Sequence, residues 1–499
     1  MAAPATAPAT APPREGRPLH QRLGLVVGLV VLGGMLALPV PEGLGPAGWR
    51  VAAVAALMAV WWMTEALPIA ATSLVPLVCF PLLGVAPIRD AAAPYAHPII
   101  FLFLGGFLLA KGMERWGLHR RVALSIIVRL GPRPRRIVLG FMLAAAALSM
   151  GISNTATAVM MLPIALSVVE LARRDEAGSE AEEQRFALVL MLGVAYACSV
   201  GGLATLIGTP TNALLAGFVD EQYGVELSFA AWMSVGLPLS ALGLAVVYVT
   251  LTRFVFPVRL PEIPGGRAFI RERLVALGPM RRRERLVAVV FGGAALLWIT
   301  RPLLAGVVPG LSDAGIAIAG ALLLFGLPAG AGERLLDWPT ARTIPWGVLL
   351  LFGGGLSLAA AVADSGLAGW IGERLAAFEA WPTWALVGVV VGTVVLLTEL
   401  TSNTATAAAF LPVLAALATQ VGTEPLLLLV PATVAASCAF MLPVATPPNA
   451  IVYGSGHLTI GQMARAGVWL NLALAVLVTA LAVVCVPLLT GPVLPPLTP

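Results

Sequence analysis

Long apolar stretches recur along the chain and are separated by short polar segments. A helix needs about 20 apolar residues to cross a hydrocarbon core of roughly 30 Å. Stretches that approach this length occupy 22–40, 50–66, 69–86, 136–168, 187–217, 230–256, 286–306, 312–329, 382–415, 424–455 and 466–491. Shorter pieces interrupted by glycine occupy 98–130 and 345–377. The pattern predicts an all-α polytopic membrane protein with about eleven transmembrane helices.

The two halves of the chain carry the same polar motifs. SNTATA occurs at Ser153–Ala158 and again at Ser402–Ala407, an offset of 249 residues. The segment TPTN at 209–212 is matched by TPPN at 446–449, an offset of 237. A longer polar loop in the first half explains the different offsets. Such internal symmetry is typical of secondary transporters that are built from inverted repeats.

The repeat divides the chain into five segments. They are a disordered cytoplasmic tail (1–21), a first span with the first repeat (22–256), a basic cytoplasmic linker (257–285), a second repeat (286–491) and an extracytoplasmic tail (492–499). The first repeat is expected to hold a hairpin near 98–118, SNT at 153–155 and TPTN at 209–212. The second is expected to hold a hairpin near 345–372, SNT at 402–404 and TPPN at 446–449.

Composition and charge narrow the function. Only 11% of the residues are charged and 59% are hydrophobic, whereas soluble proteins average about 25% charged residues, so a soluble enzyme is excluded. The net charge is +5, and the basic residues cluster before the first span, near 115–136 and at 253–285. None of these clusters belongs to a folded soluble module, so nucleic-acid binding is a poor explanation for them. The positive-inside rule places the N-terminus and the central linker in the cytoplasm and the uncharged C-terminus outside. The four histidines have no metal-like spacing.

The SNT segments place hydroxyl and amide groups inside apolar spans. In hydrocarbon such groups must find partners. A single copy is better explained by hydrogen bonds that hold helices together. Two copies in matching positions instead favour helices that are broken at the midplane. Free N–H groups at one half-helix start favour an anion, and free C=O groups at another half-helix end suit a small cation. Neither motif contains an acid, which fits an anionic substrate.

The paired SNT motifs, together with MLPVATPPNAIVYGSG near the end, resemble the divalent anion/sodium symporter family. The resemblance extends from Leu23 to Leu489. It implies a homodimer in a bacterial inner membrane, with an elevator-type transport domain and re-entrant hairpins at Gly105-Gly106 and Gly354-Gly355. It also implies sodium-coupled import of a divalent anion without a cofactor, in the first place a C4-dicarboxylate such as succinate, malate or fumarate.

The resemblance also assigns binding residues. Substrate would contact Asn154, Thr155, Asn403, Thr404, Thr209, Pro210, Thr446 and Pro447. One sodium site would use Ser149, Ser153, Asn154 and the backbone near Gly202. The other would use Thr398, Ser402, Asn403 and the backbone near Ala445.

Several alternatives remain open at this point. Sulfate or another inorganic anion could replace the dicarboxylate, and exchange could replace symport. Glu65 and Glu399 lie in apolar spans, where acids are functional candidates, so each is either a proton site or a structural carboxylate. Thr211 stands where the second half has Pro448, and its hydroxyl either contacts substrate or faces away. An anion channel is a more distant alternative.

Overall fold

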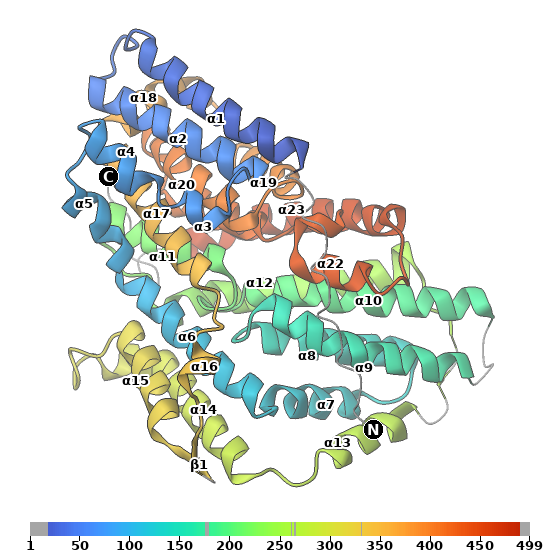
Figure 1. Ribbon diagram of the computed structural model, residues 1–499. Coiled ribbons are helices and arrows are strands. Elements are labelled where there is room, and N and C mark those ends of the chain that lie inside the picture. The colour runs from blue at the N-terminus through green and yellow to red at the C-terminus, as the bar shows by residue number, and fades with distance from the viewer. Residues whose placement is uncertain (1–17, 175–178, 261, 264–265, 331, 490–499) are drawn as a thin grey trace, which may run out of the picture.

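The computed structural model describes residues 18–174, 179–260, 262–263, 266–330 and 332–489, which are almost entirely helical. The first part contains α1 (Leu19–Ala37), α2 (Pro46–Thr64), α3 (Ile69–Thr72), α4 (Val75–Leu82), α5 (Ile88–Ala92), η1 (Ala93–Ala96), α6 (Pro98–Arg115), α7 (Leu118–Leu130), α8 (Pro134–Ser149), α9 (Asn154–Arg174), α10 (Glu180–Gly202), α11 (Pro210–Tyr223), α12 (Phe229–Val249) and η2 (Thr250–Val255). Figure 1 shows the course of these helices.

The second part begins with the linker helix α13 (Gly266–Ala276). It continues with α14 (Arg282–Leu304), α15 (Asp313–Gly326), the small hairpin of β1 (Pro328–Gly330) and β2 (Glu333–Arg334), α16 (Trp338–Ala341), α17 (Trp346–Asp364), α18 (Leu367–Arg374), η3 (Ala376–Phe378), α19 (Thr383–Thr398), α20 (Asn403–Gln420), α21 (Leu426–Ala436), η4 (Pro443–Ala445), α22 (Pro447–Tyr453) and α23 (Ile460–Leu489). The strands pair antiparallel.

The outer surface has the character of a lipid-facing surface. Exposed Leu, Ile and Val side chains follow α1, α14 and α23. Nine helices of the described part are long and apolar enough to span a membrane. The predicted all-helical, multi-pass membrane architecture is therefore confirmed. The count differs from eleven because the predicted spans 69–86, 312–329, 382–415 and 424–455 contain only shorter apolar helices, whereas 88–115 and 346–364, predicted as shorter pieces, contain helices that are long enough.

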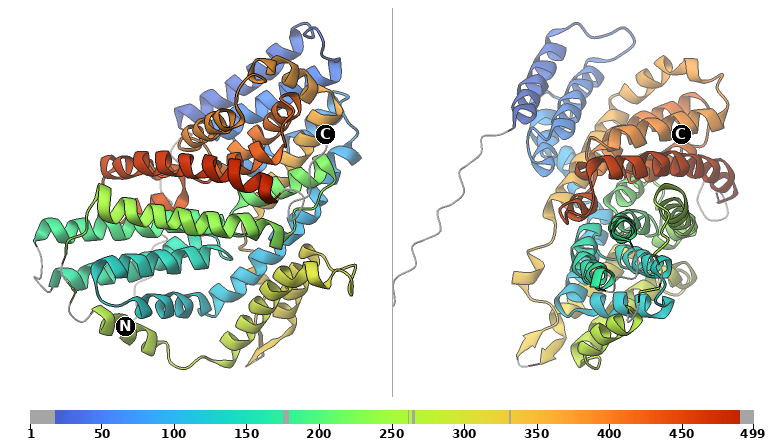
Figure 2. Two further views of the ribbon diagram at one scale, coloured as in Figure 1. Left: turned by 180° about the vertical axis from the view of Figure 1, so that it is seen from behind. Right: turned by 90° about the vertical axis from the view of Figure 1, so that its right-hand side faces the viewer.

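The helices that carry the repeated motifs correspond between the two halves. The starts of α7, α8 and α9 are each followed, 249 residues later, by the starts of α18, α19 and α20. α11 and α22 are related by the offset of 237. The equivalent helices α6 and α17 run in opposite directions, because Phe352 of α17 packs on Phe103 whereas Ser357, further along α17, donates to the carbonyl of Ala91 before α6. Figure 2 shows α12 beside α10 and also beside α23, so helices of the two halves meet there.

The SNT segments lie at the tips of helical hairpins. α8 and α9 both pack along α10, and the turn between them contains Ser153. α19 and α20 pack along α21 in the same way around Ser402. The ranges predicted as hairpins, 98–118 and 345–372, instead consist mainly of the long helices α6 and α17. Each of these ends at a glycine with positive φ, Gly117 or Gly366, and a second helix follows.

The predicted tails and linker differ in detail from the structure. α1 begins at Leu19, so the last residues of the predicted tail 1–21 are helical, while 1–17 lie outside the described residues. The linker 257–285 contains α13 and the start of α14. The predicted tail 492–499 lies outside the described residues.

Candidate functional site

Both hairpin tips and both TP segments face one central cavity of about 770 Å³. Every residue predicted to bind substrate lines it: Asn154, Thr155, Asn403, Thr404, Thr209, Pro210, Thr446 and Pro447. Ser153, Ser402 and Ala445 line it as well, whereas Ser149, Gly202 and Thr398 lie behind this wall. The structure thus brings together side chains from α9, α20 and the starts of α11 and α22.

Oxygen atoms of the first half gather behind the cavity wall. Ser149 ends α8, Asn154 begins α9 and Gly202 ends α10. The Ser149 hydroxyl and Asn154 Oδ1 are buried and have no hydrogen-bond partner among the described residues. A methyl group on Gly202 would lie 3.0 Å from Asn154 Oδ1 and 2.9 Å from the carbonyl oxygen of Gly208, so these oxygens are close together. Such groups at broken helix ends are sodium ligands in transporters.

Ser153, which also belongs to the predicted sodium set, has an additional role as a helix cap. Its hydroxyl accepts a hydrogen bond from the backbone N–H of Ala156 at 3.2 Å and so caps α9. N-terminal caps of this kind satisfy one of the free N–H groups of a helix start. Ser153 therefore fixes the orientation of the helix that presents Asn154.

The second half repeats the arrangement, but its hydroxyl, that of Thr398, has hydrogen-bond acceptors nearby, unlike the hydroxyl of Ser149 within the described residues. Thr398 Oγ1 lies 2.7 Å from Asn403 Oδ1 and 2.7 Å from the carbonyl oxygen of Ala436. A hydroxyl has one proton and can donate it to only one of these oxygens at a time. The other oxygen is then free to act as a ligand, together with the lone pairs of Thr398.

The asparagines of the TP-x-N segments hold the broken helices in place, a role that the sequence did not indicate. Asn212 and Asn449 are both fully buried. Their Nδ2 groups donate to carbonyl oxygens that correspond under the offset of 237, namely those of Gly202 and Thr205 in the first half and of Ala439 and Leu442 in the second. The same interaction thus fixes both unwound segments.

The two backbone positions predicted for the sodium sites, Gly202 and Ala445, are not equivalent. The offset pairs Gly202 with Ala439, and it pairs Gly208 with Ala445. Gly208 lines the cavity but is absent from the site residues predicted from the sequence. A methyl group on Gly208 would overlap the carbonyl oxygen of Gly202 and lie 2.9 Å from that of Ser149. Alignment of the two TP segments could have identified it.

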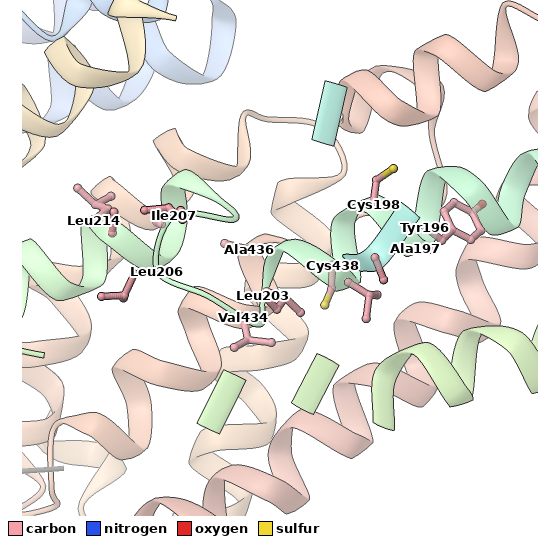
Figure 3. Packing of buried hydrophobic residues seen from close by; sticks show 14 of the residues in the cluster. Tyr196, Ala197, Cys198, Leu203, Leu206, Ile207, Leu214, Val434, Ala436 and Cys438 are labelled. Atoms are coloured by element: carbon pink, nitrogen blue, oxygen red, sulfur yellow. The ribbon is translucent and has the colours of Figure 1, made fainter. Parts of the chain in front are cut away.

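Direct contacts join the broken helices of the two halves. Thr211 Oγ1 lies 2.8 Å from Ser437 Oγ, so the extra hydroxyl of the first half is turned toward the second half. Tyr196 donates to the carbonyl of Phe440 at 2.7 Å, and their rings pack edge to face. Figure 3 shows the buried apolar side chains around these breaks, including Cys198 and Cys438.

Glu399 is buried and bound to the backbone beyond α21. Its carboxylate accepts hydrogen bonds from the N–H groups of Phe440, Met441 and Leu442 and from the side-chain amide of Asn471, at 2.7–3.2 Å. These contacts favour the structural role over the proton site, because the carboxylate satisfies N–H groups that the broken helix leaves free.

We expect Glu399→Gln to lower the midpoint of thermal unfolding without altering the pH dependence of uptake. The glutamine NH₂ group would face backbone N–H groups, and the loss of charged acceptor bonds costs about 1.5–3 kcal/mol each. Asn471→Ala, which removes one donor only, should cost less. A Glu399→Gln protein of normal thermal stability with altered pH dependence would instead identify a proton site.

Three charged side chains lie at the edge of the cavity. Lys111 and Glu114 of α6 form an ion pair of 2.6 Å. Glu65 follows α2 with φ of 48°, the one left-handed non-glycine residue in the described part of the chain. The cavity lining therefore combines the neutral donors of the SNT and TP segments with these three charged side chains.

The family model for the transmembrane region of sodium:sulfate symporters matches residues 19–490. The chain belongs to this family. It is 44% identical over 479 residues to the sodium-dependent dicarboxylate transporter SdcS of Staphylococcus saprophyticus, with 94% of this chain and 92% of that protein covered. SdcS of Staphylococcus aureus strain USA300 matches with the same identity and coverage. Membership in a transporter family confirms the prediction of a transporter rather than an enzyme.

Two solved structures share the fold at low sequence identity. The YdaH transporter of Alcanivorax borkumensis matches with a TM-score of 0.55 and 16% identity, over 95% of this chain and 98% of that one. MtrF of Neisseria gonorrhoeae, described as representing a class of antimetabolite efflux pumps, matches with a TM-score of 0.55 and 13% identity, over 93% and 94%. These likenesses concern the fold alone.

Proposed function

We propose that this symporter-family protein imports a C4-dicarboxylate such as succinate, malate or fumarate together with sodium ions. The observation that carries the proposal is the single cavity lined by both SNT tips and both TP segments. The 44% identity to transporters named sodium-dependent dicarboxylate transporters supports the choice of substrate and coupling ion.

The cavity offers suitable chemistry for a dianion. α9, α20 and α11 all begin at its wall, with Asn154, Asn403 and Pro210 as their first residues. Helix starts carry free N–H groups and partial positive charge, which stabilise a carboxylate. Asn and Thr side chains add neutral donors, so two carboxylates can be bound without a buried arginine.

Sodium ions bound behind the cavity wall would complete the dianion site. Ser149, Ser153, Asn154 and the Gly202 backbone form one proposed sodium site. Thr398, Ser402, Asn403 and the backbone near Ala445 form the other. Asn154 and Asn403 are shared, since an amide oxygen can face the cation while the amide nitrogen faces the carboxylate. Each bound cation would thus orient a substrate donor, and substrate and sodium affinities would be coupled.

Orientation and mechanism follow from the same assignment. The positive-inside rule places the N-terminus and the basic linker together in the cytoplasm. α1 would then cross outward and α2 would cross back, so that the end of α2 is cytoplasmic. The cavity lined by Glu65, Glu114 and Thr343 would open to that side. The structure would then be an inward-facing state of an elevator-type homodimer. Bound sodium would keep the substrate in its site until the hairpin tips had moved to the other side of the membrane.

Uptake into proteoliposomes tests the proposal. We expect labelled succinate to accumulate when an inward sodium gradient is imposed, with more than one sodium per substrate, and choline in place of sodium to abolish it. Unlabelled malate and fumarate should compete, and sulfate, citrate and tartrate should compete less. Preferential competition by sulfate would favour the inorganic-anion alternative. Sodium-independent uptake driven by internal succinate would show an exchanger.

A further inference from the structure

A second large cavity, of about 650 Å³, lies away from the transport site. Its lining comes from the end of α9, the start of α10, η2, the following segment and the α22–α23 loop with the first turns of α23. The residues are Arg173, Ala181, Gln184, Arg185, Leu188, Val255, Phe256, Pro257, Gly456, His457, Leu458, Thr459, Gln462 and Arg465. We call it the basic pocket. Its helix ends lie at the right-hand edge of Figure 1.

The charge of the basic pocket is of one sign. Three arginines face it, and no aspartate or glutamate is among the described residues that line it. Arg173 approaches His457 Nδ1 at 3.4 Å, so the imidazole takes a hydrogen bond from a cation. Burial, and then the Arg173 guanidinium, lower the pKa of His457. An anion in the pocket would relieve the repulsion among these groups.

Part of the lining is apolar and lies next to the arginines, since the Arg465 guanidinium is 5.9 Å from the centre of the Phe256 ring. Leu188, Val255, Phe256 and Leu458 are buried and form part of the lining. Val255 ends the π-helical turn η2, a rare geometry that is frequent at functional sites. Pro257 belongs to the basic linker, which places the pocket on the proposed cytoplasmic side. Basic pockets between membrane helices on that side suit phospholipid headgroups.

We propose that the basic pocket binds a phosphate-bearing anion. Arginine guanidinium groups match phosphate oxygens with paired hydrogen bonds, and Gln184, Thr459 and Gln462 supply neutral polar groups. Arginines that merely obey the positive-inside rule would need only to face the cytoplasm, whereas these three line one open pocket together with apolar side chains. The ligand is either the headgroup of an anionic phospholipid or a soluble phosphate compound.

The pocket is close to the transport machinery. α22 begins at Pro447 in the transport cavity, and three residues after its end the chain reaches Gly456 and His457 in the basic pocket. A helix of this length is about 10 Å long. An anion that joins Arg173 of α9 to the α22–α23 loop would hold a first-half hairpin against a second-half helix, so its binding should stabilise the protein.

The test uses full-length protein in neutral detergent with saturating succinate and sodium, so that the transport cavity is already occupied. Inorganic phosphate is titrated at constant ionic strength and sodium concentration. In a second arm, phosphatidylglycerol or phosphatidylcholine is added. Thermal unfolding midpoints and lipid retention in native mass spectrometry are the readouts. Arg185→Gln with Arg465→Gln is compared with Arg281→Gln and Arg282→Gln, which remove the same charge outside the pocket.

We expect one probe to raise the midpoint saturably in the wild type and in the Arg281/Arg282 control. The Arg185/Arg465 variant should need at least tenfold more of that probe or fail to respond, while succinate still stabilises it. A response to phosphate without lipid identifies a soluble ligand, and a response to phosphatidylglycerol alone identifies a lipid headgroup. Equal responses of the two variants, or no response of the wild type, overturn the proposal. If the double variant does not fold, Arg465→Gln alone, at an exposed position, is used instead.

Discussion

Gly208→Ala should reduce the apparent sodium affinity of uptake by ten- to hundredfold or abolish transport. The added methyl group would overlap the carbonyl oxygen of Gly202 and lie 2.9 Å from that of Ser149. Both oxygens are backbone atoms, so relief requires movement of the unwound segment itself. Overpacking of this kind costs about 1–3 kcal/mol or more, and 1.4 kcal/mol is a factor of ten in affinity. Sodium titrations of succinate uptake measure the effect.

The second half supplies the control for this substitution. The residue equivalent to Gly208 is Ala445, so that half already accommodates a methyl group. We expect Ala445→Gly to change sodium affinity less than Gly208→Ala does. Sodium affinities that are unchanged in Gly208→Ala, at matched expression, would show that no cation binds between these carbonyls, and the first sodium site would have to be sought elsewhere.

The positions of the polar motifs could be predicted because the repeat constrains them twice. Ser153 and Ser402 stand at identical places in two related halves, and chance polar positions would not recur with the same surroundings. The same reasoning gives the helix breaks, since Pro210 and Pro447 cannot donate the hydrogen bond that a continuous helix needs. Both conclusions depend on local chemistry, which the sequence displays directly.

The geometry of the hairpins could not be predicted in the same way. The glycine pairs at 105–106 and 354–355 look like turns, yet they lie inside long helices. A methyl group on Gly105 would lie 2.5 Å from the backbone of Ala317, and one on Gly354 would overlap the backbone of Ser73. These glycines permit close packing of helices that are distant in sequence, and a glycine needed for such packing cannot be told from a turn glycine without the tertiary contact.

The roles of the buried polar groups also required the structure. Glu399 looked equally like a proton site and a structural carboxylate because its donors, the N–H groups at 440–442, lie 41 to 43 residues away. Thr211 is a similar case, since its partner Ser437 is 226 residues distant. Sequence reveals that such groups are unusual, whereas only the fold reveals which atoms they contact.

Asn154→Ala and Asn403→Ala should each lower the apparent affinities for both sodium and succinate by about 5- to 150-fold. Loss of the amide removes a cation ligand and a carboxylate donor together, and the groups left unpaired in a dehydrated site cost about 1–3 kcal/mol. The two need not be equal. Asn403→Ala also takes an acceptor from Thr398 Oγ1, which keeps the Ala436 carbonyl as partner, whereas Asn154 Oδ1 has no hydrogen-bond partner within the described part of the chain.

The comparison of these variants with matched substitutions decides what SNT does. Ala156→Ser and Ala405→Ser place a hydroxyl in the same motifs without removing a proposed ligand, and we expect smaller losses from both. Ala156 lines the cavity and Ala405 is buried, so Ala156→Ser is the cleaner control. If both Asn→Ala proteins retained wild-type affinities for sodium and succinate, the motif would only hold helices together. Losses in sodium affinity that are larger at saturating succinate than at low succinate would show that the amide couples the two ligands, because the variant would then lack the increase in sodium affinity that bound succinate gives the wild type.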